Sequence, residues 1–429
     1  MAALSWLTTY LQWTRALESP TIFHRWCALT GVAHILGRKV WMVRGGKYAI
    51  FPAQVSTILV GDSAKVKKGI AMKQILTLLA ACPPGVVNIM PERTSPQELF
   101  NRLQPRDDGG VLIPNAPAVG LIVAEELGTF FGVESFLETM ATIVTRLLDA
   151  PHGTIDHESH AVASVLKTIA FKSWSVELRD PCVQILGGTT PTGVAKEIPA
   201  AARTGGFIGR VFFVYADQTD RAPNPLTDVV KTDNALQEQL IAGLHRVADL
   251  NGPVWFTKEG RVWFEDWYVH THHPAVAHLD TTVVQETGFI GRKADHLLRV
   301  AIVLAACRVA GGEDTRFRVT RGDLEESLQY LSGIERGLPT AMREVGTAKE
   351  AEPTQRFLAL LEKHPKGLAR RVALQRLWRY GVDRRTLDER VLPTLMQSGQ
   401  VTEITRGTEA IYFREHTSGG KLRRVREVD

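Results

Sequence analysis

The segment "STILVGDSAKVKKGIAMKQIL", Ser56 to Leu76, contains the most informative pattern in the chain. Its first part belongs to the run "VSTILV", which is apolar and β-branched and predicts a buried strand, and "IAMKQILTLLA" has apolar residues at helical spacing. Between them Gly61 opens a short basic loop. A strand, a glycine-led loop with lysines and a helix, in this order, are typical of a phosphate-binding loop, in which backbone N–H groups surround the phosphates of a nucleotide.

The loop departs from the usual pattern G-x-x-x-x-G-K-[ST]. Counted strictly from Gly61, the lysine position falls on Lys67, the glycine before it is Val66, and the hydroxyl position is Lys68, which cannot bind a cation. A β-branched side chain resists the positive φ of that glycine. Either the loop has one extra residue, so that Lys68 contacts phosphate and Gly69 is the flexible point, or the site is impaired or a plain basic turn. The residues expected around a nucleotide are Gly61, Asp62, Ser63, Ala64, Lys65, Val66, Lys67, Lys68, Gly69 and Ile70.

Two later strands end in polar residues. "LIVAEEL" is an apolar strand that delivers Glu125 and Glu126 at its carboxyl end, where ligands bind in open α/β sheets. We expect Glu125 to hold Mg²⁺ and Glu126 to polarise the attacking water. Thr189 and Thr190 end another apolar strand and are expected to face the γ-phosphate or that water, with a simple turn as the alternative.

Arg210, in "GGFIGR", precedes the last strand of this series. We expect it to reach a phosphate in a neighbouring subunit as an arginine finger, a role that stabilises transition-state charge. A surface ion pair is the alternative.

Hydrophobic patterns and charge divide the chain into segments. The chain begins with a helical pattern and a hairpin pattern, and strands and helices then alternate. A helical region and a polar linker follow. The last segment has three helices and two strands, which is the order of a winged-helix module. We expect an N-terminal helical segment and hairpin at 1–52, an α/β core at 53–222, a helical region at 223–345, a linker at 346–353, a winged helix at 354–416 and a basic tail at 417–429.

The positive charge lies in the C-terminal segment. The net charge is +5, but residues 354–429 hold 16 Lys and Arg against 9 Asp and Glu, a net of +7, and the first 353 residues hold 35 against 37, a net of −2. A basic module beside a nearly neutral body indicates a polyanion partner, most simply DNA or RNA. The expected phosphate contacts are Arg370, Arg371, Arg384 and Arg385.

Several motifs in a fixed order carry a resemblance. These are "LVGDSAKVKKGIAM", "LIVAEELG", "LLDAPHGT", "ILGGTTPTG", "GGFIGRVFFVYAD" and "GRKADHLLRVAIVLA". The string resembles a family of mobile-element and phage-encoded P-loop ATPases that occur in or beside primase–helicase proteins, with a core similar to hexameric AAA+ helicases. It covers roughly Ser19 to Leu338. The resemblance implies ATP and Mg²⁺ as cofactors, DNA as a partner, a homo-oligomeric ring, most simply a hexamer, a separate primase or replication protein, and a helical lid at 223–345.

The resemblance also implies roles for particular residues. Loops of this family often end in Arg-Lys-Gly or Lys-Lys-Gly, as this one does, and Arg292 matches the position where the lid brings an arginine to the γ-phosphate. Lys167 and Lys172 lie where related helicases carry DNA-contacting hairpins, with ordinary surface lysines as the alternative. The loop differs from the family by having Ala64 and Val66 for glycines and Ile70 where threonine is common, which leaves the Mg²⁺ contact unassigned.

Other features indicate no additional chemistry. Apolar runs are too short for a membrane span, and the first residues have no secretion-signal pattern, so we expect a cytoplasmic protein. The isolated Cys27, Cys82, Cys182 and Cys307 are expected in the core. Two histidine groups, at 152–160 and 270–273, lack metal-ligand spacing and are expected to be exposed or capping. Trp255, Trp263, Phe264 and Trp267 are expected in the lid core, with a base-stacking surface as the alternative.

The sequence therefore predicts an α/β P-loop NTPase of the AAA+ or helicase kind with a helical N-terminal segment, a helical lid and a winged helix. Its expected function is that of an ATP-dependent DNA helicase or translocase in phage or mobile-element replication. The main alternative is a non-enzymatic DNA-binding replication or partition factor with a vestigial nucleotide site. A further alternative is an ATP-driven defence or signalling protein built on the same core.

Overall fold

The structure is a computed structural model of the chain. It contains two compact units, Met1–Met342 and Arg343–Asp429. The residues that the structure describes are 4–44, 48–107, 109–113, 116–131, 134–148, 154–155, 162–163, 166–171, 174–198, 206–222, 234–273, 288–314, 316–342, 354, 356–365, 367–378, 382–397, 399–406 and 409–414.

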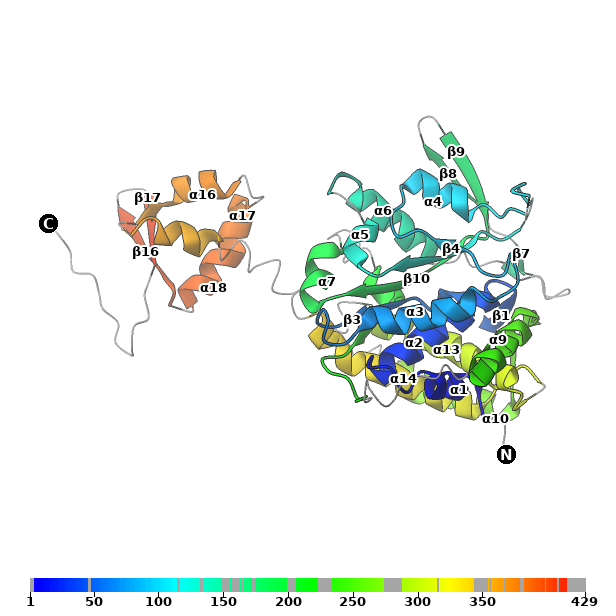
Figure 1. The fold of residues 1–429 in the computed structure, drawn as a ribbon. Helices are drawn as coiled ribbons and strands as arrows, with labels where there is room; N and C mark the ends of the chain where they lie inside the picture. The colour runs from blue at the N-terminus through cyan, green and yellow to red at the C-terminus, as the bar shows by residue number, and fades with distance from the viewer. Residues whose placement is uncertain are drawn as a thin grey trace. The chain divides into compact units, whose positions relative to one another are not determined.

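A parallel five-stranded sheet forms the centre of the first unit (Figure 1). Its strands are β3 (Thr57–Val60), β4 (Ile89–Met90), β5 (Val119–Ala124), β10 (Cys182–Thr189) and β11 (Phe212–Tyr215). They lie in the order β11-β3-β10-β5-β4. Every residue of β3 and β10 is buried, as continuous apolar runs in a parallel sheet require. The mixed α/β class and the parallel sheet agree with the sequence prediction.

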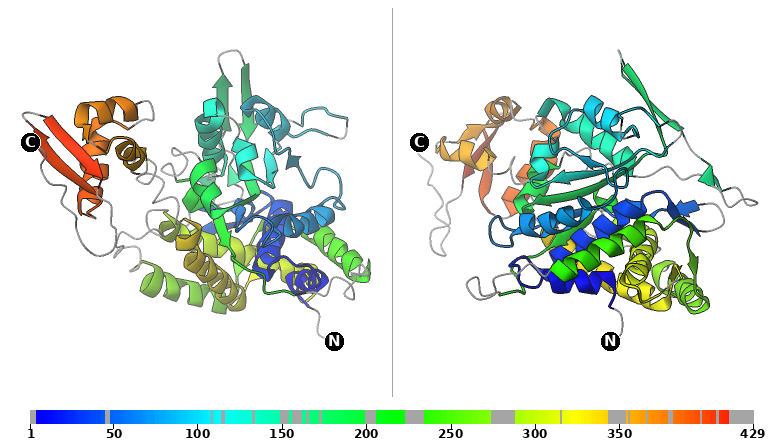
Figure 2. Two further views of the ribbon diagram at one scale, coloured as in Figure 1. Left: turned by 60° about the vertical axis from the view of Figure 1, so that its left-hand side comes forward. Right: turned by 45° about the vertical axis from the view of Figure 1, so that its right-hand side comes forward.

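Helices cover both faces of the sheet (Figures 1 and 2). One face carries α2 (Thr21–Leu36), α3 (Lys68–Leu79) and α13 (Phe289–Gly311), and the other carries α4 (Pro96–Leu103), α5 (Leu127–Phe131) and α6 (Glu134–Leu148). Helix α2 packs closely on α3, since a Cβ placed on Gly31 would lie 2.4 Å from Ile75 Cγ1. At the start of helix α4 the Ser95 hydroxyl accepts from the Glu98 N–H at 3.2 Å. The N-cap of α2 is Pro20.

The helices expected as a lid belong to the body of the first unit. These are α9 (Asn234–Ala248), α10 (Lys258–Trp267), α13 and α14 (Arg321–Ala341). Helix α13 is buried at every position from Ala294 to Cys307 except Asp295, which is the pattern of a core helix. The N-terminal α1 (Trp6–Trp13) joins the same layer, where Trp6 Nε1 donates to Leu240 O at 2.8 Å. These contacts explain why the segments expected at 1–52, 53–222 and 223–345 form one unit.

Hairpins and short bridges complete the first unit. The expected hairpin of β1 (Val40–Arg44) and β2 (Tyr48–Ile50) forms, and β1 also pairs with β12 (Gly252–Pro253). An antiparallel hairpin of β8 (Leu166–Phe171) and β9 (Trp174–Arg179) extends away from the central sheet (Figure 1). The shorter strands are β6 (Thr154–Ile155), β7 (Val162–Ala163), β13 (Trp255–Phe256) and β14 (Arg318–Val319).

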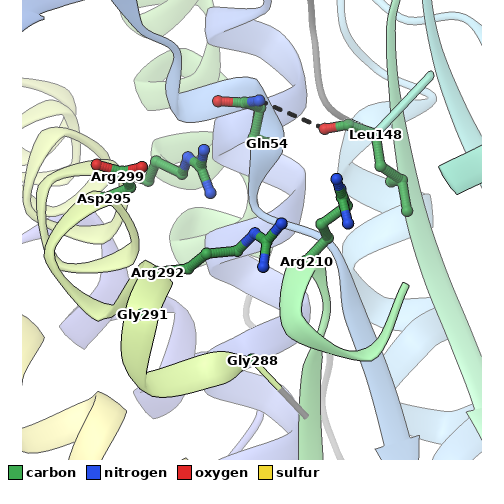
Figure 3. Close-up of a pocket in the computed structure, with 8 residues that line it drawn as sticks. All are labelled: Gln54, Leu148, Arg210, Gly288, Gly291, Arg292, Asp295 and Arg299. Carbon is green, nitrogen blue, oxygen red and sulfur yellow. Dashed lines mark hydrogen bonds between the residues drawn. The ribbon is translucent and has the colours of Figure 1, made fainter. Parts of the chain in front are cut away.

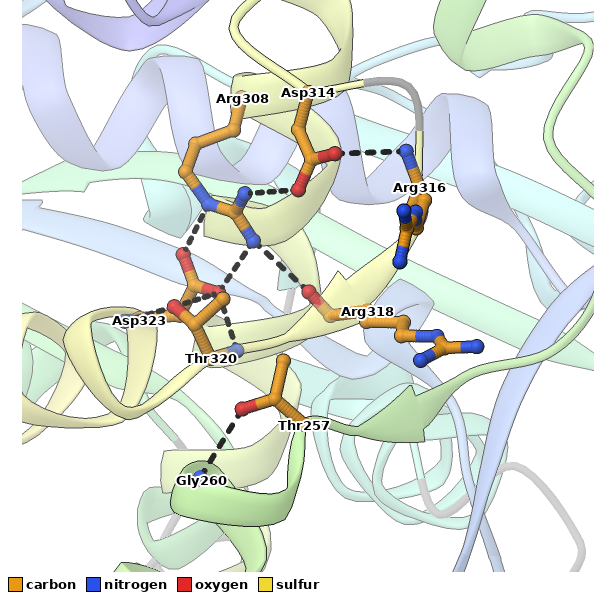
Figure 4. A network of polar contacts seen from close by, with 8 residues as sticks. All are labelled: Thr257, Gly260, Arg308, Asp314, Arg316, Arg318, Thr320 and Asp323. Carbon is orange, nitrogen blue, oxygen red and sulfur yellow. Dashed lines mark hydrogen bonds and ion pairs between the residues drawn. The ribbon is translucent and has the colours of Figure 1, made fainter.

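A buried polar network joins α13 to the start of α14 (Figure 4). The Arg308 guanidinium donates to both carboxylate oxygens of Asp323, at 2.9 and 2.8 Å, and to Asp314 at 2.9 Å. Asp323 is only 4% exposed, and it also forms a capping box with Thr320, the N-cap of α14. Hydrogen bonding to Asp323 raises the pKa of Arg308, which stays charged. One carboxylate thus serves both a helix start and an interhelical ion pair.

The second unit contains three helical stretches and a small sheet. A helix at 356–362 is followed by β15 (Leu368–Ala369), α16 (Arg370–Trp378) and a continuous helical run made of α17 (Arg384–Thr386), η4 (Leu387–Val391) and α18 (Leu392–Gln397). Strands β16 (Val401–Arg406) and β17 (Glu409–Arg414) form a hairpin, in the sheet order β15-β17-β16. The core includes Phe357, Leu361, Leu377, Leu387 and Tyr412. The element order is the predicted one, with β15 added.

Some expectations about single residues need correction. Trp255 is 50% exposed, so it is not core, whereas Trp267 is buried at 7% exposure. His272 is also buried, against the expected exposed or capping position, because its ring stacks on Trp267 with centroids 5.1 Å apart. Cys27, Cys182 and Cys307 are buried as predicted, while Cys82 is half-buried. The linker 346–353, the tail 417–429, the histidines at 152–160 and Lys172 lie outside the described residues.

No helix in the described part of the chain has the length and apolar character needed to cross a membrane.

Candidate functional site

Two residues of the loop that joins β3 to α3 have a left-handed backbone conformation. Positive φ occurs at Ala64 (62°) and at Lys67 (47°), and Val66 is fully buried. The Val66 side chain packs under the loop, because a Cβ on Gly61 would lie 2.6 Å from its Cγ2, and Ser19 Oγ donates to Val66 O at 3.4 Å. Lys67 therefore occupies the left-handed position that a glycine usually takes before the helix.

The two adjacent lysines point to different partners. Lys68 is the first residue of α3, and its Nζ returns to the start of the loop and donates to Gly61 O at 2.6 Å. Lys67 Nζ lies 3.9 Å from Glu18 Oε2, and its side chain is 43% exposed. Burial lowers the pKa of the Lys68 ammonium, while the nearby carboxylates of Asp62, Glu197 and Glu126 raise it. Lys68 is thus the lysine held inside the loop.

The loop also presents backbone N–H groups. Within the described residues, no N–H group from Asp62 to Lys67 donates a hydrogen bond, and these groups stand next to the N-terminus of the 12-residue helix α3. Successive N–H groups followed by a helix N-terminus favour an anion, because the helix dipole and the amide donors act together. Together with Lys68, the loop has the donors that a phosphate group requires.

The two glutamates follow β5 at the same edge of the sheet. Both are exposed. Glu125 faces the start of α3, since a Cβ on Gly69 would lie 3.6 Å from Glu125 Oε2. The backbone N–H of Glu126 donates to Glu92 Oε1 at 3.1 Å. In the register in which Lys68 is the phosphate lysine, Gly69 stands at the hydroxyl position, so a carboxylate lies beside the place where a hydroxyl is missing.

The end of β10 closes the site between the loop and the glutamates. A Cβ on Gly188 would lie 2.7 Å from Glu125 O and 3.6 Å from Lys68 Cε, so only glycine lets these groups approach. Thr189 Oγ1 donates to Glu197 Oε2 at 2.7 Å. Thr190 is the N-cap of α7 (Pro191–Glu197), where its Oγ1 accepts from Gly193 N at 3.0 Å. The Thr190 side chain thus has the turn-forming role that was the alternative.

Glu197 is a residue of this site that sequence reasoning missed. Its Oε2 also accepts from Gly128 N at 3.1 Å, and its charge acts on Lys68. It reaches Thr189 because the short helix α7 turns back over the end of β10. The only sequence signal is the Thr190–Pro191 helix start, which predicts α7 and not the direction in which it runs.

The sheet topology places this cluster at a switch point. The chain leaves β3 in the direction of β4 and leaves β10 in the direction of β11, so the connections of these two adjacent strands run in opposite directions across the sheet. Residue pairing aligns Thr189 with Val60 and Gly187 with Ala124, which brings the carboxyl ends of all three strands together. Ligands of open α/β sheets bind in such a crevice.

Arg210 and Arg292 lie near the amino-terminal ends of the strands, on the side of the sheet away from the loop (Figure 3). They line a cavity of about 450 Å³ together with Gln54, which precedes β3. Arg210 ends η2 (Ile208–Arg210) just before β11, and β11 pairs in parallel with β3 from Phe212 opposite Thr57. The four residues of each strand, about 13 Å, therefore separate these arginines from Lys68. The structure groups the two arginines with each other and not with the loop.

The residues expected to contact DNA are spread over both units. Lys167 belongs to β8 of the projecting hairpin. In the second unit, Arg370 forms an ion pair with Asp388. Arg384 and Arg385 begin the last helical run; they are 80% and 82% exposed, and pair with Asp388 and Glu389 one turn later. Arg371 is exposed.

We found no known protein-family model that matches this chain, and no curated protein matches it significantly. Among the described residues, no group of three or more His, Cys, Asp or Glu side chains forms a metal site.

Proposed function

We propose that this chain is an ATP-dependent DNA helicase or translocase built on a P-loop NTPase core with a C-terminal winged helix. One observation carries the proposal. Lys68 folds back over a loop whose backbone N–H groups donate no hydrogen bond to any described residue, at the carboxyl ends of the strands, where Glu125, Glu126 and Thr189 also lie. A nucleotide triphosphate requires this combination of amide donors, a cation and carboxylates.

The residues at this edge fit ATP with Mg²⁺. The phosphates would be held by the backbone N–H groups from Asp62 to Lys67 and by Lys68. Mg²⁺ keeps several waters and is usually bound through one or two carboxylates and the phosphates, so the lack of a three-ligand protein cluster is compatible with it. Glu125 would be its carboxylate. Bound Mg²⁺ would neutralise charge on the phosphates, and Glu126 is exposed and able to orient a water.

Assembly into a ring is supported by the position of Arg210 and Arg292. Both lie at the sheet edge away from Lys68, so in one chain they are distant from the proposed nucleotide. A second copy that docks this edge against the loop of the first would bring a guanidinium to the phosphates. The position therefore favours action between subunits, for Arg292 as well as Arg210.

DNA binding is supported by charge and by the element order of the second unit. A helix–helix–helix–hairpin module places its third helix in the major groove. The exposed pairs Arg384–Asp388 and Arg385–Glu389 are weak, since exposed i,i+4 pairs contribute about 0.3–0.5 kcal/mol, and phosphates can compete for these arginines. The β8–β9 hairpin, with Lys167, offers a second contact.

The direct test is ATP hydrolysis and strand displacement with and without DNA, in the wild-type protein and in Glu126→Gln. We expect the variant to bind ATP normally and to hydrolyse it roughly 100-fold more slowly, because a neutral amide cannot polarise water as a carboxylate does. Glu98→Gln is the matched control, because that exposed glutamate pairs with Arg102 on α4 and should leave turnover unchanged.

The alternative function, that of a non-enzymatic DNA-binding factor, predicts a different result in the same experiment. A DNA-binding replication or partition factor with a vestigial site would show no change in function on Glu126→Gln. Gly69, which supplies no hydroxyl, is the observation that favours this rival. A wild-type protein that bound DNA but neither bound nor hydrolysed ATP would decide for it.

The missing hydroxyl predicts that a serine in place of Gly69 would strengthen Mg²⁺ binding. A Cβ on Gly69 meets nothing closer than Glu125 Oε2 at 3.6 Å, so Gly69→Ser should fold and place an oxygen beside that carboxylate. We expect the Mg²⁺ concentration for half-maximal turnover to fall roughly tenfold, equivalent to about 1.4 kcal/mol from one added ligand. Gly69→Ala adds the same Cβ without the hydroxyl, and equal behaviour of the two variants would contradict the assignment of Gly69.

A further inference from the structure

Helix α16 of the second unit has one side in the core and the other in solvent. Ala373 and Leu377 are fully buried in the core of this unit. On the opposite side of the helix, Arg371, Gln375 and Trp378 are exposed. They follow one another after four and three residues, so their side chains lie in one line along the helix, about 10 Å long. We call these three residues the α16 face.

Arg371 differs from the other three arginines that the sequence predicts to contact phosphate. Each of those three pairs with a carboxylate of the third helical run. The Arg371 guanidinium forms no hydrogen bond or ion pair with any residue that the structure describes. Its charge does not stabilise α16 either, because a cation in the first turn of a helix opposes the helix dipole. Its position therefore favours an anion from outside the chain.

The charge of α16 is positive along its whole length. Its sequence, "RRVALQRLW", holds three arginines and neither Asp nor Glu. The segment that contains it, residues 354–429, has a net charge of +7 from 16 basic and 9 acidic residues. A helix of one sign within a segment of the same sign favours a polyanion as its partner.

Trp378 has the most exposed large apolar side chain of the described residues, at 70% exposure. Its ring makes no contact with another ring or cation in the part of the chain that the structure describes. The other large apolar side chains exposed in this unit are Met396 on α18 and Ile404 on β16. The α16 face thus has a single aromatic ring beside a cation, whereas the core of a protein–protein interface is a fully buried apolar patch. A ring of this kind is suited to stacking on a nucleic-acid base.

Gln375 lies between the arginine and the tryptophan on this face. Its amide offers both a donor and an acceptor, and neither has a partner among the described residues. A guanidinium for a phosphate, an amide for a base edge and a ring for a base face together match an unstacked nucleotide. The bases of a duplex are stacked on each other, so a single strand is the form that can offer a base face to Trp378.

We propose that the α16 face binds single-stranded DNA, with Arg371 on a phosphate and Trp378 stacked on a base of the same strand. The line of about 10 Å spans roughly three nucleotides at ~3.4 Å each. The ion pair of Arg370 with Asp388 joins α16 to the third helical run, so the single-strand site adjoins the helix expected in the major groove. This inference rests on the DNA partner of the proposed function, and not on ATP hydrolysis.

The test compares the binding of a labelled oligothymidine strand with that of a blunt duplex of the same length. The full-length protein is used without ATP, and fluorescence anisotropy gives the affinities. We expect Trp378→Leu, which stays apolar and loses the ring, to weaken single-strand binding roughly tenfold, as for the loss of one stacked base. Duplex binding should change less than about twofold, since phosphate contacts dominate it. Trp378→Phe keeps a ring and should retain single-strand affinity within roughly threefold of wild type.

The salt dependence separates the roles of the other two residues. Arg371→Ala should lower the slope of log affinity against log salt by about 0.7, the value for one phosphate contact on a single strand. Gln375→Ala should leave the slope unchanged and weaken single-strand binding roughly threefold, as for the loss of one hydrogen bond. Arg261→Ala is the charge control, because this arginine is exposed on α10 in the first unit and should leave affinity and slope unchanged.

The outcomes separate this inference from the proposed function. Equal single-strand affinity of wild type and Trp378→Leu, in a protein that binds DNA and hydrolyses ATP, overturns the inference and leaves the proposed function intact. Equal losses for single strand and duplex, or a changed oligomeric state of Trp378→Leu with unchanged single-strand affinity, also overturn it, in favour of duplex DNA or a second copy of the chain. Single-strand binding that depends on Trp378 in a protein without ATP hydrolysis supports the inference and excludes the helicase. A wild-type protein that binds neither DNA overturns both.

Discussion

Replacing Lys68 by alanine should reduce ATP hydrolysis by roughly 10²–10³-fold, the cost of removing one preorganised donor to a transition-state oxygen. The reason is geometric. Lys68 Nζ is held over the loop by Gly61 O at 2.6 Å, and Gly188 leaves room for its side chain between β10 and the glutamates. Steady-state turnover with saturating Mg²⁺ and binding of a labelled ATP analogue measure the loss.

The adjacent lysine provides the control. Lys67→Gly removes the same charge one residue earlier, where the backbone has a φ of 47° that glycine adopts without strain. We expect turnover within twofold of wild type, by rough comparison with other exposed sites, and an unfolding free energy unchanged or raised by about 0.5–1 kcal/mol. A loss on Lys67→Gly equal to that on Lys68→Ala would show that the strict register, with Lys67 as the phosphate lysine, is the correct one.

The largest effect on stability is expected from Asp323→Ala. This substitution removes the capping box of α14 and leaves the half-buried Arg308 guanidinium with Asp314 as its carboxylate partner among the described residues (Figure 4). Breaking a buried ion pair by removing one partner costs about 3–5 kcal/mol. Urea unfolding of the full-length protein, followed by tryptophan fluorescence, gives the difference in unfolding free energy.

Glu325→Ala is the matched control for this prediction. It removes one carboxylate from the same helix, where Glu325 forms an exposed i,i+4 pair with Arg321 at 47% and 61% exposure. Exposed pairs contribute about 0–1 kcal/mol, so this variant should unfold close to wild type. Similar midpoints for the two variants would mean that the Arg308–Asp323 pair has little net effect on stability.

Local sequence pattern predicted much of the secondary structure. The apolar runs ending at Val60, Ala124, Thr189 and Tyr215 became the long strands of the sheet, because a buried parallel strand has a continuous apolar signature that needs no knowledge of its neighbours. The strand β15 and the pairing of β1 with β12 were not predicted, since two-residue strands carry no periodicity. The helices of the region expected as a lid pack within the first unit, which sequence pattern did not predict, because a helix buried on all sides looks like any apolar helix until its neighbours are known.

The residues of the candidate site were also predicted only in part from the sequence. Sequence pattern found the loop and the polar ends of β5 and β10, but left two lysines as alternatives. Val66 is buried against Gly61, five residues away, and its carbonyl accepts from Ser19, 47 residues away. With Val66 held there, it is the Lys68 side chain that turns back to the start of the loop. Glu197 had no motif to mark it.

The strand and helix order, the glycine-led loop, the buried character of the strands and the basic C-terminal unit all follow from local sequence pattern. These properties are local: periodicity and turn chemistry act within a few residues. Only the tertiary structure decided which lysine enters the loop, that β10 lies between β3 and β5, and that Arg210 and Arg292 lie together near the amino-terminal ends of the strands. Distances between remote segments depend on how side chains from different elements pack together, and no single segment contains that information.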